Sequence, residues 1–315
     1  MPSGLIGFSR EAMSKEPSSA ARPAQGIAWM ILTGLLFVAV TAVVKHIGDR
    51  IPAAEAAFLR YVLGLVFLLP MLGPMIREGL NAASLGLFGA RGLLHGLGVM
   101  LWFHAMTQIS IAEVTSMSYF TPIYATIGAA LFLGERLAVR RIAAILIALV
   151  GALVILRPGF REISGGHFAM LGNGVLFAMS FLIAKVVADR VPASVVVGWL
   201  SVFVTIALFP FAVAVWIWPT WSELGWLFVV SALATAGHYT MTLALRAAPI
   251  AVTQPATFLQ LVWATALGAV IFAERIDGWV MFGGVLICAS VSFIALREAA
   301  LKRRTQASEA EATRF

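Results

Sequence analysis

The segment KHIGDRIP, Lys45 to Pro52, recurs later in the chain as KVVADRVP, Lys185 to Pro192. The lysine, the aspartate, the arginine and the proline are identical in the two copies, and each copy follows a long apolar run. The offset between the copies is 185 − 45 = 140 residues. A single match of this kind can arise by chance, so a duplication needs a second repeated block.

A second block repeats in the same order and at nearly the same offset. Glu135-Arg136 recurs as Glu274-Arg275, with 274 − 135 = 139. Shorter matches precede it at the same offset, where Ile111-Ala112 recurs at 250–251 and Ala125-Thr126 recurs at 264–265. The matched blocks together predict that the chain contains two copies of one unit.

The composition indicates that lipid is the solvent for most of the chain. Of the 315 residues, 61% are hydrophobic and 12% are charged, whereas soluble domains have about 25% charged residues. The apolar residues fall in ten runs, and a helix needs roughly 20 of them to cross a bilayer. The predicted spans are residues 25–44, 54–72, 83–106, 111–133, 142–156, 168–187, 194–216, 224–244, 250–272 and 280–296.

The distribution of lysine and arginine predicts the orientation, because cytoplasmic loops of membrane proteins carry the excess of these residues. With the N-terminus inside, fifteen of the 22 basic residues are cytoplasmic, five are outside, and Arg60 and Arg91 fall within spans. Each copy contains five spans, an odd number, so the second copy enters the membrane upside down. We therefore expect an all-α integral membrane protein with ten transmembrane helices arranged as two inverted five-helix repeats.

Several short motifs carry a resemblance to a known family. They are the run AEAAFLRYVLGLVFLLP at 54–70, AEVT at 112–115, Pro122, FLGER at 132–136 and LRPG at 156–159. With these motifs the chain resembles the EamA type of the drug/metabolite transporter superfamily. The resemblance implies a central cavity lined by both halves, and characterised relatives export amino acids or take up S-adenosylmethionine or riboflavin.

The expected domains follow from the repeat and the resemblance. Residues 1–24 are predicted to form a disordered cytoplasmic tail, 25–160 and 161–297 the two EamA-like five-helix repeats, and 298–315 a basic cytoplasmic tail. The expected location is the cell inner membrane, with both termini cytoplasmic. The expected partners are a small-molecule substrate and the lipid bilayer, a homodimer is left open, and nucleic acid is not expected despite the net charge of +7.

Charged residues within the spans are the first candidates for substrate binding, because a charge at mid-membrane costs from about 3 to more than 10 kcal/mol. Arg60 lies near the outer end of its span, at a depth similar to that of Glu113. Arg60 is therefore expected either to extend to the lipid headgroups, or to pair with Glu113 or with a substrate carboxylate.

Arg91 and His95 stand four residues apart and therefore share one helical face. Either residue can instead be structural, Arg91 by reaching the headgroups and His95 as a core histidine. No acidic residue is spaced to complete a metal site with the histidines, so neither a metal nor another cofactor is expected. The remaining candidates are polar or aromatic residues that line a cavity or join helices, namely Trp102, His238, Tyr239, Gln254 and Gln260.

The leading functional prediction is a secondary transporter that moves a small metabolite by alternating access, not an enzyme. The sequence contains no phosphate-binding loop of the Gly-x-x-x-x-Gly-Lys-Ser/Thr type. The alternative is an integral-membrane enzyme acting on a lipid-linked substrate. Such an enzyme usually needs paired acids, whereas acidic residues near these spans are sparse and several are followed directly by arginine.

Overall fold

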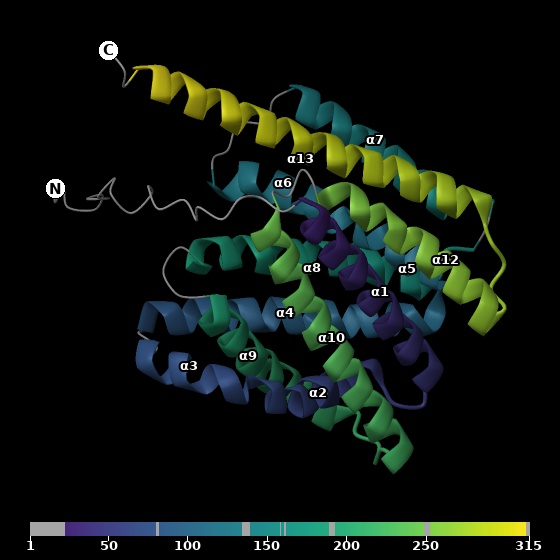
Figure 1. Cartoon of the computed structure of the whole chain (residues 1–315). Helices are drawn as coiled ribbons and strands as arrows, with labels where there is room; N and C mark the ends of the chain where they lie inside the picture. Colours follow the sequence, from purple (N-terminus) through teal and green to yellow (C-terminus); the bar gives the residue numbers. More distant parts are fainter. Residues whose placement is uncertain are drawn as a thin grey trace.

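The protein is a bundle of helices in the computed structural model (Figure 1). The structure describes residues 23–79, 82–133, 139–157, 159–160, 162–188, 193–248 and 253–312. All regular elements within these ranges are α-helices or 3-10 helices. The predicted disordered tail lies outside the described residues apart from its last two positions.

The element bounds, in chain order, are α1 Pro23–Ile47, α2 Ala53–Gly64, η2 Leu65–Met71, α3 Leu72–Glu78, α4 Ala82–Gln108, α5 Ile111–Ser118, α6 Phe120–Leu133, α7 Val139–Leu156, α8 Gly165–Ala188, α9 Ala193–Ala214, α10 Trp221–Ala247, η3 Gln254–Thr257, α12 Phe258–Phe272 and α13 Gly278–Ala312.

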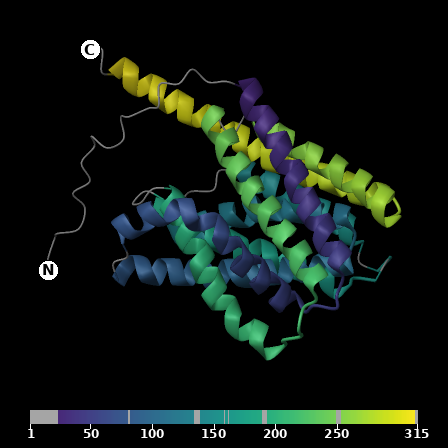
Figure 2. The same cartoon turned by 60° about the horizontal axis from the view of Figure 1, so that its bottom comes forward.

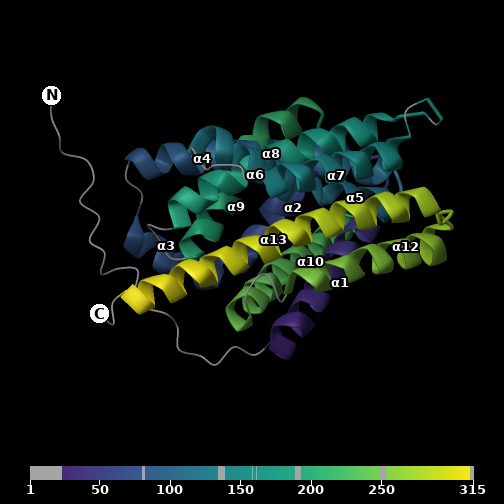
Figure 3. The same ribbon diagram turned by 90° about the horizontal axis from the view of Figure 1, so that it is seen from above.

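In the described residues the predicted spans are helical except at Tyr119, Val215 and Trp216. Five stretches are long and apolar enough to cross a membrane, and three shorter helices are also apolar. The long stretches are Ala24–Ile47, Ala53–Glu78, Ser84–Gln108, Gly165–Ala184 and Val195–Ala214, and the shorter helices are Ile142–Leu156, Leu259–Phe272 and Gly278–Phe293. The last helix, α13, continues to Ala312, beyond the predicted end of its span, and projects past the other helices (Figure 3).

Prolines interrupt the predicted fourth and ninth spans. The fourth is divided at Tyr119, three residues before Pro122, because proline has no N–H to continue the helical ladder. The ninth contains Pro255 in the short helix η3, directly before α12. The hydroxyl of Tyr119 donates to the carbonyl of Thr257 at 2.8 Å, so the two interruptions contact each other.

Helices from the two parts of the chain alternate in space. The long helix α1 packs along α10, α4 packs along α8 and α9, and α7 packs along α13 (Figures 1 and 2). The helix α2 contacts α9 and α10, α6 contacts α8, and α12 contacts α1 and α5. The core is therefore shared between residues before and after position 160, and the largest buried cluster draws on both.

Small and polar residues set the closest helix contacts. Gly92 and Gly96 of α4 both face α9, where a Cβ at Gly92 would lie 2.5 Å from the Cβ of Phe203. Asn173 on α8 donates from Nδ2 to the carbonyl of Gly98 on α4 at 2.9 Å and is 1% exposed. Asn173 therefore joins two helices, one of the two roles predicted for intramembrane amides.

Five connections gather at one end of the bundle, which we name the Lys45 end. They are the α1–α2, α4–α5, α7–α8, α9–α10 and α12–α13 connections. Three ion pairs join them, Lys45–Glu274, Arg50–Glu223 and Arg157–Asp277. These connections alternate along the chain, so successive long helical segments run in opposite directions.

Candidate functional site

Four basic side chains face one another in the middle of the bundle, and we name them the central basic cluster. Arg60 lies on α2, Arg91 and His95 lie on α4, and His238 lies on α10. His95 is the central residue of the 27-residue helix α4, about 20 Å from either end at 1.5 Å per residue. Tyr61, next to Arg60 on α2, meets the His95 ring at 6.5 Å. Ser231, two turns before His238 on α10, donates to the carbonyl of Arg60 at 2.6 Å, so these contacts bring α2, α4 and α10 together.

Aromatic rings surround the histidines of this cluster. His95 stacks on Phe177 of α8, with ring centroids 4.7 Å apart and planes 19° apart. The ring of Tyr61 lies nearly perpendicular to the ring of His95, with the two centroids 6.5 Å apart. His238 meets Phe37 of α1 edge-on at 5.2 Å. The cluster is therefore bordered by α1, α2, α4, α8 and α10.

Arg60 is covered by protein. The residue is 8% exposed. Its guanidinium carbon lies 4.3 Å from the centre of the Tyr61 ring, which is a cation–π geometry. Its backbone carbonyl accepts a hydrogen bond from Ser231 of α10 at 2.6 Å. The Nε atom is buried without a hydrogen-bond partner. This burial does not fit the alternative in which Arg60 extends to the headgroups.

Arg91 is held against the neighbouring helix. Its Nη1 donates to the carbonyl of Val196 on α9 at 3.2 Å, and its Nε is buried without a partner. Within the described part of the chain, no carboxylate forms an ion pair with Arg91 or with Arg60. Among the described residues, the two guanidinium groups are thus charged groups of the bundle interior without an acidic partner.

Glu113 has a different environment from the one expected. The structure does not pair it with Arg60; its Oε1 lies 3.3 Å from Nε2 of His167, and both residues are buried. Its Oε2 accepts from the backbone N–H and the hydroxyl of Ser110, completing a capping box at the start of α5. The predicted Arg60–Glu113 contact is wrong because Glu113 stays at the start of α5 as part of the capping box, whereas Arg60 lies two turns into α2.

His167 is a buried polar residue that sequence reasoning missed. It is 2% exposed near the start of α8, and its Nδ1 lies 3.0 Å from the hydroxyl of Ser164. The sequence around it, ISGGHF, has no repeated counterpart, and the carboxylate that contacts it, Glu113, is 54 residues away in the chain. Ser164, three residues earlier, is the one local signal, because a serine at this spacing is typical of a helix N-cap and places His167 in the first turn of α8.

The other predicted site residues are not joined to the central basic cluster by any contact the structure describes. Trp102 is half-buried and packs on the largest core cluster beside Phe103. The Cβ of Gln260 lies against Gly34 of α1, so this amide is at a helix contact. Tyr239 is 63% exposed. The side chain of Gln254 lies outside the described residues.

Glu274 connects three segments at the Lys45 end. Its Oε1 lies 2.5 Å from Nζ of Lys45, and its Oε2 accepts from the N–H of Ile111 at 3.1 Å. The carboxylate therefore also occupies the positive end of the α5 dipole. Lys45 in turn donates to the carbonyl of Ile109 at 2.9 Å. Glu274 thus fastens the end of α12 to the end of α1 and to the start of α5.

The backbone around Glu274 explains how its side chain reaches these partners. Helix α12 ends with Ala273 in the left-handed conformation, at φ 51°. The N–H of Glu274 then bonds back to the carbonyl of Gly268 at 3.0 Å. A Cβ at Gly268 would collide with the Glu274 carboxylate, so glycine at this position is what leaves room for it.

Two further ion pairs lie at the same end. Arg157 pairs with Asp277, whose carboxylate also accepts from the N–H of Trp279 at 2.9 Å and so caps α13. Arg50 pairs with Glu223, with Nε to Oε1 at 2.6 Å, in an exposed position. The hydrogen bond and the opposite charge of Glu223 raise the pKa of Arg50 above its ordinary value.

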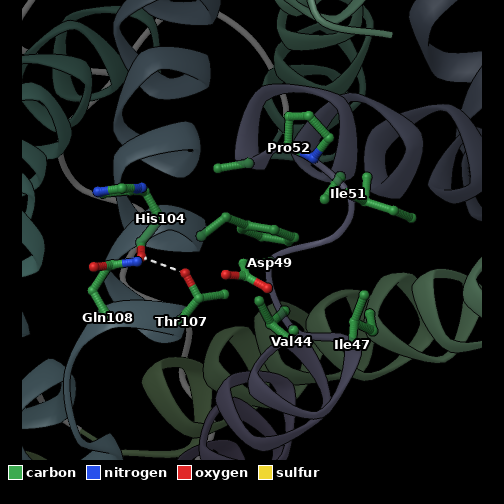
Figure 4. Close-up of a pocket in the computed structure, with 12 residues that line it drawn as sticks. Val44, Ile47, Asp49, Ile51, Pro52, His104, Thr107 and Gln108 are labelled. Carbon is green, nitrogen blue, oxygen red and sulfur yellow. Dashed lines mark hydrogen bonds between the residues drawn. The ribbon is translucent and has the colours of Figure 1, made fainter. Parts of the chain in front are cut away.

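A separate pocket of about 310 Å³ opens at the Lys45 end (Figure 4). Its lining comes from the end of α1, the α1–α2 connection, the start of α2 and the end of α4, and most of it is apolar. Asp49, His104, Thr107 and Gln108 are the polar groups labelled there. The pocket involves one half of the chain and no member of the central basic cluster, so we assign the candidate site to the cluster.

Nothing in the described chain suggests a metal centre. No three histidine, cysteine, aspartate or glutamate side chains among the described residues gather as ligands. Cys288 is a free thiol, buried on α13. Its surroundings are apolar core residues, which is an environment for packing.

Comparison with known proteins gives a consistent family match. The model of the EamA-like transporter family matches the chain twice, over residues 24–157 and 164–296. A solved crystal structure that is 21% identical superposes with a TM-score of 0.55 and covers 88% of this chain and 100% of its own. At that identity the likeness concerns the fold alone.

Several curated transporters are similar to the chain over nearly their whole length. A riboflavin transporter of Rhizobium johnstonii is 29% identical over 94% of this chain and 98% of its own. An S-adenosylmethionine uptake transporter of Rickettsia prowazekii is 25% identical over 87% and 93%. The pseudopaline exporter CntI of Pseudomonas aeruginosa is 25% identical over 86% and 95%.

Proposed function

The chain belongs to the EamA-like transporter family, and from that premise we propose that it exposes one central site alternately to the two sides of a membrane. It is an integral membrane protein and a transporter of small metabolites, as its family and its named relatives indicate, and not an enzyme. The finer proposal concerns how the two halves of the chain are arranged and what moves between them.

We infer two five-helix halves, 25–160 and 161–297, related by a two-fold axis in the membrane plane. In this scheme α1 corresponds to α8, α2 to α9, α4 to α10, α5 and α6 to α12, and α7 to α13. Exchanging partners converts the α1–α10 contact into α8–α4, and the α4–α9 contact into α10–α2, all of which are present. The contacts α2–α9 and α7–α13 are their own counterparts. This regularity supports the inverted repeat.

We place the Lys45 end on the outer side of the inner membrane and both termini in the cytoplasm. The support is the excess of lysine and arginine in the connections at the opposite end and in the terminal segments. Trp218, Trp221 and Trp279 are exposed at the Lys45 end, as interfacial tryptophans are.

The contact between Lys45 and Glu274 is the observation on which the mechanism depends. Lys45 belongs to the repeated block of the first half and Glu274 to the repeated block of the second. Their ion pair fastens the two halves at the Lys45 end, above a central basic cluster to which both halves contribute. The described conformation is then closed to the outside, and breaking this contact lets the halves rock apart to open the site there.

Counterflow in proteoliposomes tests the proposal. The probes are radiolabelled riboflavin and S-adenosylmethionine, because relatives are named for them. Vesicles preloaded with an unlabelled probe should accumulate the labelled form above its equilibrium level, since a carrier exchanges molecules one for one. Accumulation of neither probe, nor of an amino-acid mixture, above protein-free vesicles would contradict a metabolite carrier of this kind.

Cysteine labelling tests the inverted arrangement independently. Single cysteines replace Asp49 and Asp189 in a Cys288→Ser background, and a membrane-impermeant maleimide is added to intact cells. We expect labelling at position 49 and, for position 189, labelling after permeabilisation alone. Equal labelling of the two positions from one side would contradict two inverted halves.

A further inference from the structure

The central basic cluster carries positive charge that the protein does not neutralise. Arg60 and Arg91 each have a buried Nε without a hydrogen-bond partner. The Tyr61 ring contacts both the Arg60 guanidinium, at 4.3 Å, and the His95 ring, at 6.5 Å. Arg91 lies one turn before His95 on α4. The part of the chain that the structure describes places no carboxylate in this group.

Two buried acids at the Lys45 end, Glu55 and Glu113, have other partners. Glu55 precedes Arg60 by five residues on α2, about 140° around a helix that turns 100° per residue. Its Oε2 accepts from the N–H of Ile217 at 2.8 Å, at the Lys45 end. Glu113 is bonded to His167 and Ser110. Neither acid therefore compensates the guanidinium groups.

An uncompensated guanidinium in the middle of a membrane protein requires a counter-ion or water. Arg60 is more than nine-tenths buried, so bulk water does not surround it. A ligand that brings its own negative charge would satisfy both the charge and the free N–H donors, and guanidinium binds carboxylate and phosphate with particular geometric fit.

The rings around the cluster add a second selection. His95 and Phe177 form one stacked pair, and Tyr61 and Phe37 stand edge-on to the two histidines. Aromatic side chains of this kind favour ligands with planar rings, which stack on them or meet them edge-on. The arginines therefore select for an anionic group on the ligand, and the aromatic side chains select for a planar ring on the same ligand.

We propose that the central basic cluster binds a small organic anion, a planar aromatic or heteroaromatic compound bearing a carboxylate or a phosphate, through Arg60 and Arg91. This rests on the proposed function, since it names the substrate class of that carrier. His95 and His238 add hydrogen-bonding capacity beside the ring. A substrate with a net positive charge, such as a sulfonium, is disfavoured by the same two arginines.

Matched probes that differ by one charge test the proposal. Riboflavin 5′-phosphate is compared with riboflavin, and 4-hydroxybenzoate with 4-hydroxybenzamide, each added to the purified full-length protein in detergent. Thermal stabilisation over a concentration series gives an apparent Kd for each probe. In at least one pair we expect the anion to bind about tenfold more tightly than its neutral partner. The pair that responds distinguishes phosphate from carboxylate.

Variants connect the preference to the arginines. Arg60→Met and Arg91→Met should each bring the anion and the neutral probe to within about twofold of one another, because the charge that separates them is gone. Arg60→Lys should retain part of the preference. Arg77→Gln removes an exposed positive charge from α3 and serves as the matched control, with the preference unchanged.

The outcomes separate this inference from the proposed function. Equal or tighter binding of the neutral member in both pairs, or an anion preference that survives in both methionine variants, would overturn the inference. Counterflow of riboflavin or S-adenosylmethionine would still support the carrier. Should one methionine variant fail to fold, the other gives the decision, because the arginines lie on different helices.

Discussion

The Lys45 end and the centre of the bundle treat their positive charges in opposite ways. At the Lys45 end, Lys45, Arg50 and Arg157 each meet a carboxylate. In the centre, Arg60 and Arg91 meet an aromatic ring and a backbone carbonyl, with no carboxylate among the described residues. Near water, where an unpaired charge costs little, the three basic side chains have acidic partners. Away from water, where an unpaired charge costs more, the two arginines have no acidic partner among the described residues.

This difference indicates what each region does. Ion pairs across the two halves stabilise one relative placement of those halves, and they can break and re-form at little cost near water. In the proposed mechanism, the negative charge of a substrate compensates the arginines of the centre when it binds. The Lys45 end would then control the conformation, and the centre would determine which ligand binds.

The largest expected effect tests the closed end. Lys45→Met leaves the Glu274 carboxylate, whose side chain is 14% exposed, without its cation. Losing one partner of such a partly buried pair should destabilise the closed conformation by about 2–3 kcal/mol. Spin labels at positions 49 and 279, in a Cys288→Ser background, should then show a new population at longer distance.

A double variant makes this prediction sharper. Adding Glu274→Leu to Lys45→Met removes the stranded carboxylate, so part of the closed population should return. An unchanged distance distribution in the single variant would mean that the ion pair does not hold the halves together, and the contrast between the two regions would fail there.

A second prediction concerns the buried Glu113. Glu113→Ala removes the carboxylate that caps α5 and contacts His167, and should cost about 2 kcal/mol of stability through the lost cap and the lost hydrogen bond. The measurement is the thermal unfolding midpoint of the purified protein. Glu162→Ala, an exposed acid in the α7–α8 connection, is the control and should leave the midpoint in place.

Helices and their order could be predicted because the signals are local. Ten apolar runs are visible in the sequence, and nearly all the described residues of those runs are helical. The repeated blocks also drew attention to Lys45 and Glu274, because each belongs to one of the two blocks that recur in the chain. The ion pair between Lys45 and Glu274 could not be predicted, because a sequence repeat does not show which residues of one copy contact the other copy.

Partners across the bundle could not be predicted from depth alone. The sequence suggested a similar depth for Arg60 and Glu113, yet Arg60 lies two turns into α2 against Tyr61, whereas Glu113 lies in the first turn of α5 against His167. Helix rotation decides this, and it follows from packing such as the close approach of Gly92 to Phe203. The repeat carries the counterparts of Lys45 and Glu274 at Lys185 and Glu135, whose side chains lie outside the described residues.

A third prediction reverses the sign of the first. Arg60→Met removes a buried cation that has no acidic partner, so the ligand-free protein should become more stable, by about 1 kcal/mol, because a desolvated charge is replaced by an apolar chain of similar length. Thermal unfolding without added ligand measures it. A lower midpoint for Arg60→Met, with Arg60→Lys unchanged, would show that the protein itself compensates Arg60.

The smallest expected effect compares two ion pairs at the same end. Arg50 pairs with Glu223 in an exposed position, where water and salt screen the attraction and the flexible side chains lose entropy on pairing. Arg50→Gln should therefore leave the thermal midpoint and the spin-label distances unchanged at physiological salt. Lys45 differs because it also donates to the carbonyl of Ile109 and because Glu274 also caps α5. If Arg50→Gln opened the Lys45 end as far as Lys45→Met does, net charge at that end would control closure, and the specific contact of the two repeated blocks would not.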